Sequence, residues 1–185
     1  MKKLLILLLL TFLCSCANTP EGISDAMNVR QKLYESNGCN FEATVTADYA
    51  DKTYEFSMDC STESSGAVSF TVIAPETIAG VAGVISDDGG KLTFDDKVLL
   101  FEPLTDGRLS PAIAPWIMIR TLSGGYIKAA SHGEIGTVIT FDDIYMSENL
   151  QVEITFDSMQ RPIYCEILWE GRRILSTRIS NFTFK

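Results

Sequence analysis

Between residues 39 and 60 the chain alternates twice between apolar and polar side chains, with a short polar break between the two runs. The apolar positions are Phe41, Ala43, Val45, Ala47 and Tyr49 in the first run, and Tyr54, Phe56, Met58 and Cys60 in the second. A period of two residues is typical of a strand with one dry face and one solvated face. The pattern predicts an antiparallel hairpin that turns at residues 50–52.

A helical period precedes this hairpin. Apolar or long side chains recur at three- and four-residue spacing, at Ile23, Ala26, Met27, Arg30, Leu33 and Tyr34. Asn37 and Gly38 then supply a C-terminal helix stop. These features predict one amphipathic helix over residues 21–36, whose stripe must pack on a later part of the chain.

Short apolar runs separated by Gly, Pro, Ser and Asp continue to the C-terminus. They predict further strands at about residues 66–74, 77–86, 91–95, 97–102, 126–131, 136–142, 151–157, 162–169 and 173–184. Ser110 and Pro111 begin a second helix over residues 110–124, which Pro115 should kink or restart. The fold class expected is mainly β (α+β), with about eleven antiparallel strands, an N-terminal helix and one inserted helix.

The N-terminus carries an export signal. Lys2 and Lys3 precede a mostly aliphatic run from Leu4 to Leu13, which is too short for a stable transmembrane anchor. The following Leu13-Cys14-Ser15-Cys16 resembles the lipobox of bacterial lipoproteins, which implies cleavage before Cys16 and diacylation of its thiol. An ordinary signal peptide with an incidental cysteine is the alternative. We therefore divide the chain into a signal peptide (1–15), a lipidated tether (16–22) and one folded domain (23–185).

The charge balance narrows the range of partners. Loss of residues 1–15 removes two lysines and leaves 13 basic against 24 acidic residues, a net charge of −11 (13 − 24). Such a surface repels nucleic acid and anionic headgroups, so attachment to a bacterial membrane should come from the acyl chains on Cys16. We expect an extracytoplasmic protein that has membrane lipid as its first partner and does not bind nucleic acid.

The order of elements resembles the LolA/LolB-like lipoprotein carrier family. The family shows a strand ending in proline, an apolar strand and a Ser-Asp-Gly turn, which correspond here to residues 70–75, 78–85 and 86–92. The resemblance implies a curved antiparallel half-barrel, an apolar cavity beneath lid-like helices and a role in holding lipid acyl chains. Soluble carriers have an arginine six residues before the proline that ties lid to barrel. Ser69 stands at that position here, which favours the receptor-like or lipid-sensing members as comparisons.

Aromatic residues on the predicted dry face, with two residues of the inserted helix, are the candidates for lining such a cavity. They are Phe41, Tyr54, Phe56, Phe94, Phe101, Trp116, Ile117, Phe156 and Trp169. A curved sheet that short helices cover only in part either fills its dry face with side chains or leaves room for a ligand. A packed core made of the same residues is therefore the alternative.

Candidate chemistry is sparse. His132 is the one histidine and lies in a predicted turn, and the paired aspartates at 87–88, 95–96 and 142–143 are typical of solvated turns. No spacing suits zinc, no glycine-rich loop cradles phosphate, and no pattern indicates a cofactor. We expect a protein without enzymatic activity.

Three cysteines remain in the folded domain. If Tyr49 faces Tyr54 across the hairpin, Ala43 faces Cys60, and Cys39 lies about 13 Å further along the same face. A Cys39–Cys60 disulfide is then a candidate only with a bulge or a folded-back strand start. Cys165 alternates with Ile163 and Ile167, which indicates a small buried apolar residue.

Two functions follow from these observations. The first is a membrane-anchored, non-catalytic lipoprotein that binds acyl chains, a lipoprotein or another hydrophobic ligand in a half-barrel cavity. The second is an envelope scaffold with a packed core and no ligand, which binds a protein partner through its lid or an exposed strand edge.

Overall fold

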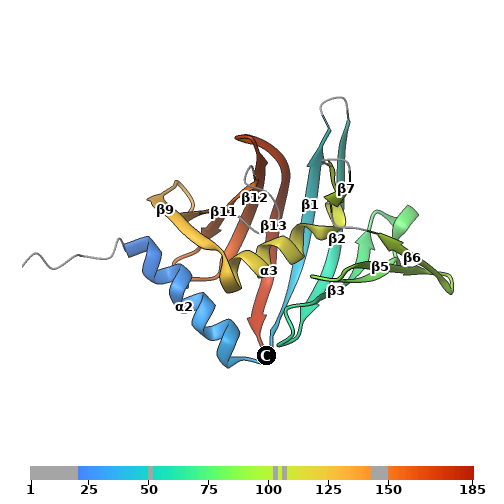
Figure 1. The fold of residues 1–185 in the computed structure, drawn as a ribbon, viewed down its shortest axis with the longest axis horizontal. Helices are drawn as coiled ribbons and strands as arrows, with labels where there is room; N and C mark the ends of the chain where they lie inside the picture. Colours follow the sequence, from blue (N-terminus) through green and yellow to red (C-terminus); the bar gives the residue numbers. More distant parts are fainter. Residues whose placement is uncertain (1–20, 50–51, 102–103, 106–107, 143–149) are drawn as a thin grey trace, which may run out of the picture.

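A computed structural model describes residues 21–49, 52–101, 104–105, 108–142 and 150–185. Eleven strands form one antiparallel sheet in the order β6-β5-β4-β3-β2-β1-β13-β12-β11-β10-β9 (Figure 1). Their bounds are β1 Cys39–Asp48, β2 Thr53–Thr62, β3 Val68–Ala74, β4 Ala82–Ser86, β5 Gly89–Phe94, β6 Lys97–Phe101, β9 Tyr126–His132, β10 Thr137–Asp142, β11 Leu150–Phe156, β12 Pro162–Trp169 and β13 Arg172–Phe184. The sheet is not closed, because β6 and β9 form its two ends.

The pairing of β1 with β13 joins two halves of this sheet. Strands β1–β6 follow one another as hairpins on one side, and β9–β13 do so on the other. The two central strands are also long, with 10 and 13 residues. The mainly β fold of about eleven strands with two helices, expected from the sequence, is confirmed.

Two helices lie on one face of the sheet. Helix α2 (Glu21–Glu35) packs on β9 and β10, and α3 (Ala114–Gly124) crosses the middle strands (Figure 1). A 3₁₀ turn, η3 (Pro111–Ile113), leads into α3. Pro115 therefore lies in the first turn of α3, where its missing N–H breaks no helical hydrogen bond. Of the two outcomes expected for Pro115, the restart is the one observed.

The buried stripe of α2 matches the expected one at Ala26 and, in part, at Leu33, and differs from it elsewhere. Gly22, Ala26 and Val29 face the sheet and are buried, whereas Met27 is 48% exposed and Tyr34 is 74% exposed. The small side chains of Gly22 and Ala26 allow a close approach of α2 to the sheet. Sequence periodicity favoured the larger side chain of Met27, which follows Ala26 in the sequence and therefore points about 100° away from it around the helix.

Local departures from the predicted strands occur at turns. The segment predicted as one strand over 77–86 begins with a 3₁₀ turn, η2 (Glu76–Ile78), and only then forms β4. Strands β7 (Leu104–Thr105) and β8 (Arg108–Leu109) form a small separate sheet that the sequence did not indicate. The first hairpin pairs Ala47 with Tyr54 and Phe41 with Cys60, so the expected register was wrong by two residues.

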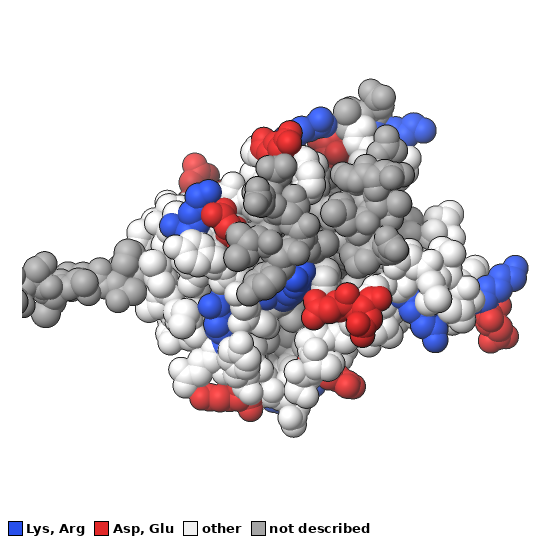
Figure 2. Space-filling view, viewed as in Figure 1, with Lys and Arg blue, Asp and Glu red and all other residues white. Residues whose placement is uncertain are grey.

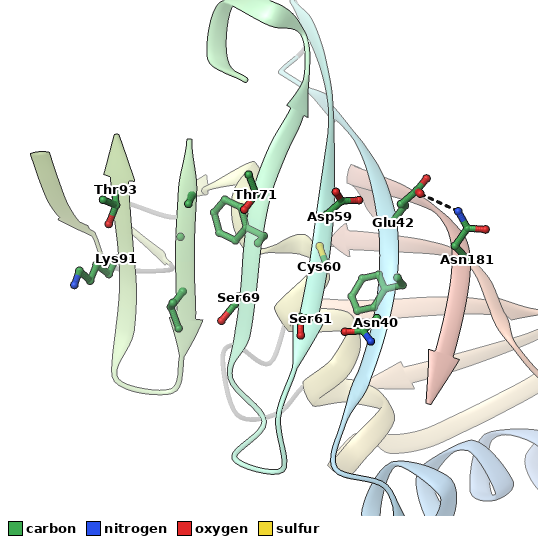
Figure 3. Close-up of a pocket in the computed structure, with 15 residues that line it drawn as sticks. Asn40, Glu42, Asp59, Cys60, Ser61, Ser69, Thr71, Lys91, Thr93 and Asn181 are labelled. Atoms are coloured by element: carbon green, nitrogen blue, oxygen red, sulfur yellow. Dashed lines mark hydrogen bonds between the residues drawn. The ribbon is translucent and has the colours of Figure 1, made fainter. Parts of the chain in front are cut away.

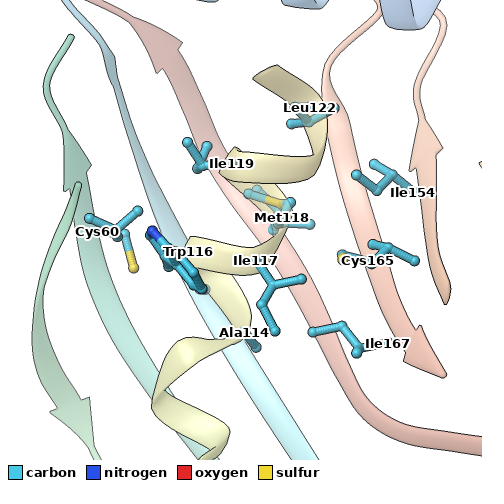
Figure 4. Close-up of a cluster of buried hydrophobic side chains, with 14 of the residues drawn as sticks. Cys60, Ala114, Trp116, Ile117, Met118, Ile119, Leu122, Ile154, Cys165 and Ile167 are labelled. Atoms are coloured by element: carbon cyan, nitrogen blue, oxygen red, sulfur yellow. The ribbon is translucent and has the colours of Figure 1, made fainter. Parts of the chain in front are cut away.

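The core lies between the sheet and α3. Apolar side chains at alternate positions of β1 point toward α3 and are almost fully buried. Eight of the eleven α3 residues are buried, among them Trp116, Ile117 and Met118 (Figure 4). Because buried residues occur on every side of α3, this helix is part of the core.

This packing predicts the effect of shortening a core side chain in α3. Ile117 has no exposed area, so Ile117→Ala should lower the free energy of unfolding by about 2–5 kcal/mol, measured by denaturant titration. Leu100→Ala, at a side chain that is 75% exposed, is the control and should change it by less than about 0.5 kcal/mol. Equal, small effects of both substitutions would contradict a core filled by α3.

Candidate functional site

The face of the sheet that carries α3, which we call the helix-side face, is filled along its middle strands. Phe41, Trp116, Ile117 and Phe156 are at most 4% exposed. Phe56 and Trp169 are partly buried against the same core, and so is Phe101 at the β6 end of the sheet. A side chain without exposed area touches no void that could hold a water molecule. In this arrangement an acyl chain could reach the buried members of the expected cavity set only if α3 moved.

The other two members of that set lie beyond the cover of α3. Tyr54 is 51% exposed near the end of the first hairpin, where its ring contacts that of Tyr49 with centroids 6.1 Å apart. Phe94 is 46% exposed near the other end of the sheet. The structure therefore distributes the nine residues between the core and two exposed positions.

Phe94 belongs to an apolar patch at the end of the sheet. Leu92 pairs with Leu99, and Phe101 lies two residues further along β6, so their side chains share the helix-side face. Leu99 is 61% exposed, while Leu92 and Phe101 are partly buried. We call Leu92, Phe94, Leu99 and Phe101 the uncovered strip.

Sequence reasoning named Phe94 and Phe101 but missed Leu99. The signal was the segment Lys97–Phe101, which reads KVLLF and does not alternate. Strand β6 ends the sheet. Its side chains alternate between the two faces, so Val98 and Leu100 lie on one face and Leu99 and Phe101 lie on the other. An end strand with apolar side chains on both faces indicates a surface that contacts something else.

Helix α2 holds the C-terminal end of α3. The Arg30 guanidinium donates to the carbonyl oxygens of Leu122 at 2.8 Å and Gly125 at 2.7 Å, and more weakly to that of Thr121 at 3.4 Å. The Tyr34 hydroxyl donates to the Ser123 carbonyl at 3.1 Å. Burial lowers the pKa of Arg30 from its ordinary value, but the positive charge still suits the negative end of a helix dipole. We call this contact the Arg30 clamp.

Ser69 does not take part in holding α3. It is exposed on the face of β3 opposite α3, whereas its neighbours Val68 and Phe70 are buried on the helix-side face. A longer side chain at this position would point away from the helix. The Arg30 clamp ties α3 to α2 instead, and no sequence pattern indicated it. Arg120 of α3 also forms an ion pair with Asp87 in the turn between β4 and β5, at 3.5 Å.

Two hydroxyls in the core have no partner among the described residues. They are Thr121 Oγ1 on α3 and Thr177 Oγ1 on β13, and both residues are at most 2% exposed. A buried hydroxyl without a hydrogen bond costs on the order of 1–3 kcal/mol. The packing of this part of the core is thus less favourable than its apolar area alone indicates.

The opposite face of the sheet carries a hollow of about 630 Å³ across β1–β5 and β13 (Figure 3). Hydroxyl, amide and charged side chains predominate among those that point into it. Glu42 accepts a hydrogen bond of 2.8 Å from Asn181. In the pairing of β1 with β2, Glu42 stands directly opposite Asp59. Because charged and amide side chains are part of this lining, we place the candidate apolar site on the helix-side face.

The three cysteines in the described part of the chain are free and buried. Because Phe41 pairs with Cys60, Cys39 is a diagonal neighbour of Cys60, at a typical Cα separation of roughly 7–8 Å. This replaces the separation of about 13 Å expected from the sequence, yet it still exceeds the usual reach of a disulfide.

Burial raises the pKa of Cys39 to about 11, against the opposing effects of Thr62 and Lys185. Burial also raises the pKa of Cys60 and Cys165, so these thiols stay protonated and unreactive at neutral pH.

The remaining candidate chemistry is dispersed. His132 is exposed at the end of β9. The described residues contain no group of three His, Cys, Asp or Glu that could hold a metal ion. Asp142 forms an ion pair with Lys128 at 3.2 Å, while Asp143 lies outside the described residues. Lysine and arginine side chains are scattered over the face shown in Figure 2.

The membrane-related segments fall mostly outside the structure. Residues 1–20, which hold the expected signal peptide, Cys16 and most of the tether, lie outside the described residues. Within the described ranges, no helix has the length and apolar character needed to span a bilayer.

The fold resembles those of several solved bacterial proteins. A LolA superfamily protein from Nitrosomonas europaea is 10% identical, with 86% of this chain and 93% of the other covered at a TM-score of 0.46. The Mycobacterium tuberculosis lipoprotein LppX is 12% identical, with 88% of this chain and 93% of LppX covered at a TM-score of 0.42. LprF from Mycobacterium bovis is 9% identical, with 89% of this chain and 93% of LprF covered at a TM-score of 0.46. No protein-family model and no curated protein matches the sequence. The expected resemblance to the LolA/LolB-like family is present as a likeness of fold.

The Arg30 clamp generates a prediction about α3. Arg30→Met keeps the aliphatic stem but removes three hydrogen bonds, so the amides at residues 120–125 should exchange with deuterium about tenfold faster or more. Arg178→Met, on an exposed residue of β13, should leave their exchange unchanged. Unaltered exchange in the Arg30 variant would show that apolar packing alone holds the end of α3.

Proposed function

We propose that this protein is an extracytoplasmic lipoprotein, anchored by acyl chains on Cys16, that binds an acyl chain or a similar apolar ligand without catalysis. The observation that carries the proposal is the uncovered strip. Leu99 and Phe94 expose 61% and 46% of their surface on the same face whose middle part is the core. Such contiguous apolar surface is typical of an interaction site.

The shape of the uncovered strip suits an elongated apolar ligand. Phe101 pairs with Gly90, so from Phe101 to Phe94 the strip covers four residue steps of β5, which is about 13 Å. It continues the apolar face that runs beneath α3, so a ligand on β5 and β6 would lie against the edge of the core. Each methylene buried there would contribute about 0.8 kcal/mol before the cost of ordering the chain.

The wider set of nine residues remains part of the proposal as a surface that opens when α3 lifts. Two features support an α3 that can be displaced. Its Thr121 hydroxyl is buried without a partner, and so is that of Thr177 on β13. In addition, the Arg30 clamp holds the end of α3 by polar contacts at the edge of the molecule, which water can replace.

Ligand binding can be tested by changing the two faces of β6 separately. Leu99→Asn removes apolar area from the uncovered strip, whereas Val98→Asn makes the same kind of change on the opposite face, at a side chain that is 55% exposed. We expect Leu99→Asn to weaken binding of a fluorescent long-chain fatty acid about tenfold or more and Val98→Asn to change it less than about twofold. Native mass spectrometry of the extracted wild-type protein should show bound lipid.

The rival function is recognition of a protein partner, and a specific observation favours it as the second candidate. Strand β6 ends the sheet, and Val98, Leu99 and Leu100 are all more than half exposed. A partner strand paired to this edge would contact both faces. Equal sensitivity to Leu99→Asn and Val98→Asn, together with no bound lipid, would support the rival and contradict lipid binding.

The proposed anchor predicts a specific chemical modification. Cys16→Ser should abolish incorporation of labelled palmitate and move the protein from the membrane fraction to the soluble fraction, because the folded domain carries a net negative charge. Cys165→Ser is the matched control and should retain the label. Palmitate incorporation that survives Cys16→Ser, or a soluble wild-type protein, would refute the anchor.

A further inference from the structure

Two exposed apolar side chains occupy neighbouring turns at the β9 end of the molecule. Ile135 lies in the turn between β9 and β10, and Met159 lies in the turn between β11 and β12. Each is 67% exposed. Residues of both turns, together with Asp25 of α2, line one hollow of about 460 Å³, which places the turns beside each other.

Both turns are held in place by hydrogen bonds. In the first, Gly133 N donates to Gly136 O at 2.8 Å. In the second, Asp157 accepts from the Met159 and Arg161 backbone at 2.9 Å each, and Arg161 Nη2 donates to its carboxylate at 2.7 Å. The exposed side chains of Ile135 and Met159 are therefore presented by ordered backbone.

The chain enters the folded domain at this same end. A β-carbon on Gly22 would lie 2.7 Å from Thr137 Cγ2, so the first turn of α2 rests directly on the start of β10. Gln160 in the second turn donates to Asp25 Oδ1 at 2.9 Å. The start of α2 and the two turns thus form one surface.

The tether fixes how far this surface can be from the membrane. Cys16 and Glu21 are five residues apart, which even a fully extended chain spans in about 17 Å. The acyl chains on Cys16 lie in the bilayer, so the start of α2 must stay within that distance of the headgroup region. Ile135 and Met159 would therefore lie at or near the lipid surface.

We propose that Ile135 and Met159 insert into the interface of the membrane that holds Cys16 and dock the domain in a fixed orientation. This inference rests on the proposed lipid anchor. The nearby ionisable side chains are Asp25, His132, Glu134 and the paired Asp157 and Arg161, and they form no basic cluster. Docking is thus driven by the apolar side chains, and it does not require anionic lipid.

The first experiment measures contact with the bilayer. Full-length lipoprotein carrying Met159→Cys is labelled with an environment-sensitive dye and reconstituted in phosphatidylcholine vesicles. The buried native thiols stay unlabelled under native conditions at neutral pH. We expect a blue-shifted emission that lipids spin-labelled near the headgroup quench. The same label at Ser64→Cys, on an exposed turn between β2 and β3, should show neither effect.

The outcomes separate the two proposals. If the labelled protein floats with the vesicles but the dye at position 159 stays in water, docking is refuted and the anchor stands. If the wild-type protein does not float, the anchor fails, and docking fails with it.

A second measurement uses unlabelled variants. A single acyl chain coupled to Cys16 gives reversible binding, and the double variant Ile135→Ser, Met159→Ser should weaken its partition into vesicles about tenfold. Met27→Ser, at a methionine that is 48% exposed on α2, should change it less than about twofold. Because all three side chains are exposed, these variants should keep the fold, which circular dichroism checks. Equal partition of the double variant and the wild type would overturn the proposal.

Discussion

An open sheet of eleven strands can remain dry on one face only where something covers it, and the structure depends on this constraint. Helix α3 provides most of the cover and is buried at eight of its eleven residues. Helix α2 covers β9 and β10 with Gly22, Ala26 and Val29. At the β6 end the apolar face continues beyond α3, and the uncovered strip is the result.

The attachment of α3 at both of its ends decides how that cover could open. At its C-terminal end, the Arg30 clamp connects it to α2 through three carbonyl oxygens. Before its N-terminal end, the Leu109 carbonyl accepts a hydrogen bond of 3.2 Å from Tyr49 at the first hairpin. Between these points apolar contacts and an ion pair of Arg120 with Asp87 at 3.5 Å hold the helix, and two buried hydroxyls weaken the packing. Opening would therefore begin with the polar contacts at either end, while the central apolar contacts set most of the energetic cost.

Sequence periodicity predicted the central strands well because they bury one face, and the alternation in β1 and β2 follows from that burial. The count of eleven strands followed from the turn residues that separate short apolar runs. Register was less accessible, since moving the hairpin by two residues leaves the same side chains on the same face. The pairing of Phe41 with Cys60 could therefore not be separated from that of Ala43 with Cys60.

The candidate site was harder to predict than the fold. Alternation shows which side chains share a face but does not show how far a helix reaches across it. Phe41 and Phe94 therefore looked equivalent in the sequence, although one is 3% exposed and the other 46%. The role of Arg30 was also hidden, because its partners are backbone carbonyls more than ninety residues away, which leave no trace in side-chain chemistry.

The two apolar surfaces of this protein lie at opposite ends of one sheet. The turns with Ile135 and Met159 belong to the β9 end, and the uncovered strip belongs to β5 and β6. Ten strand spacings separate β9 from β6, about 48 Å when measured along the curved sheet. Under the proposed lipid anchor on Cys16, the β9 end of the sheet lies nearest the bilayer, and the strip is presented away from it. This geometry suits a ligand that arrives from outside that membrane, because lipid from the anchoring bilayer would have to leave the bilayer before it could reach the strip.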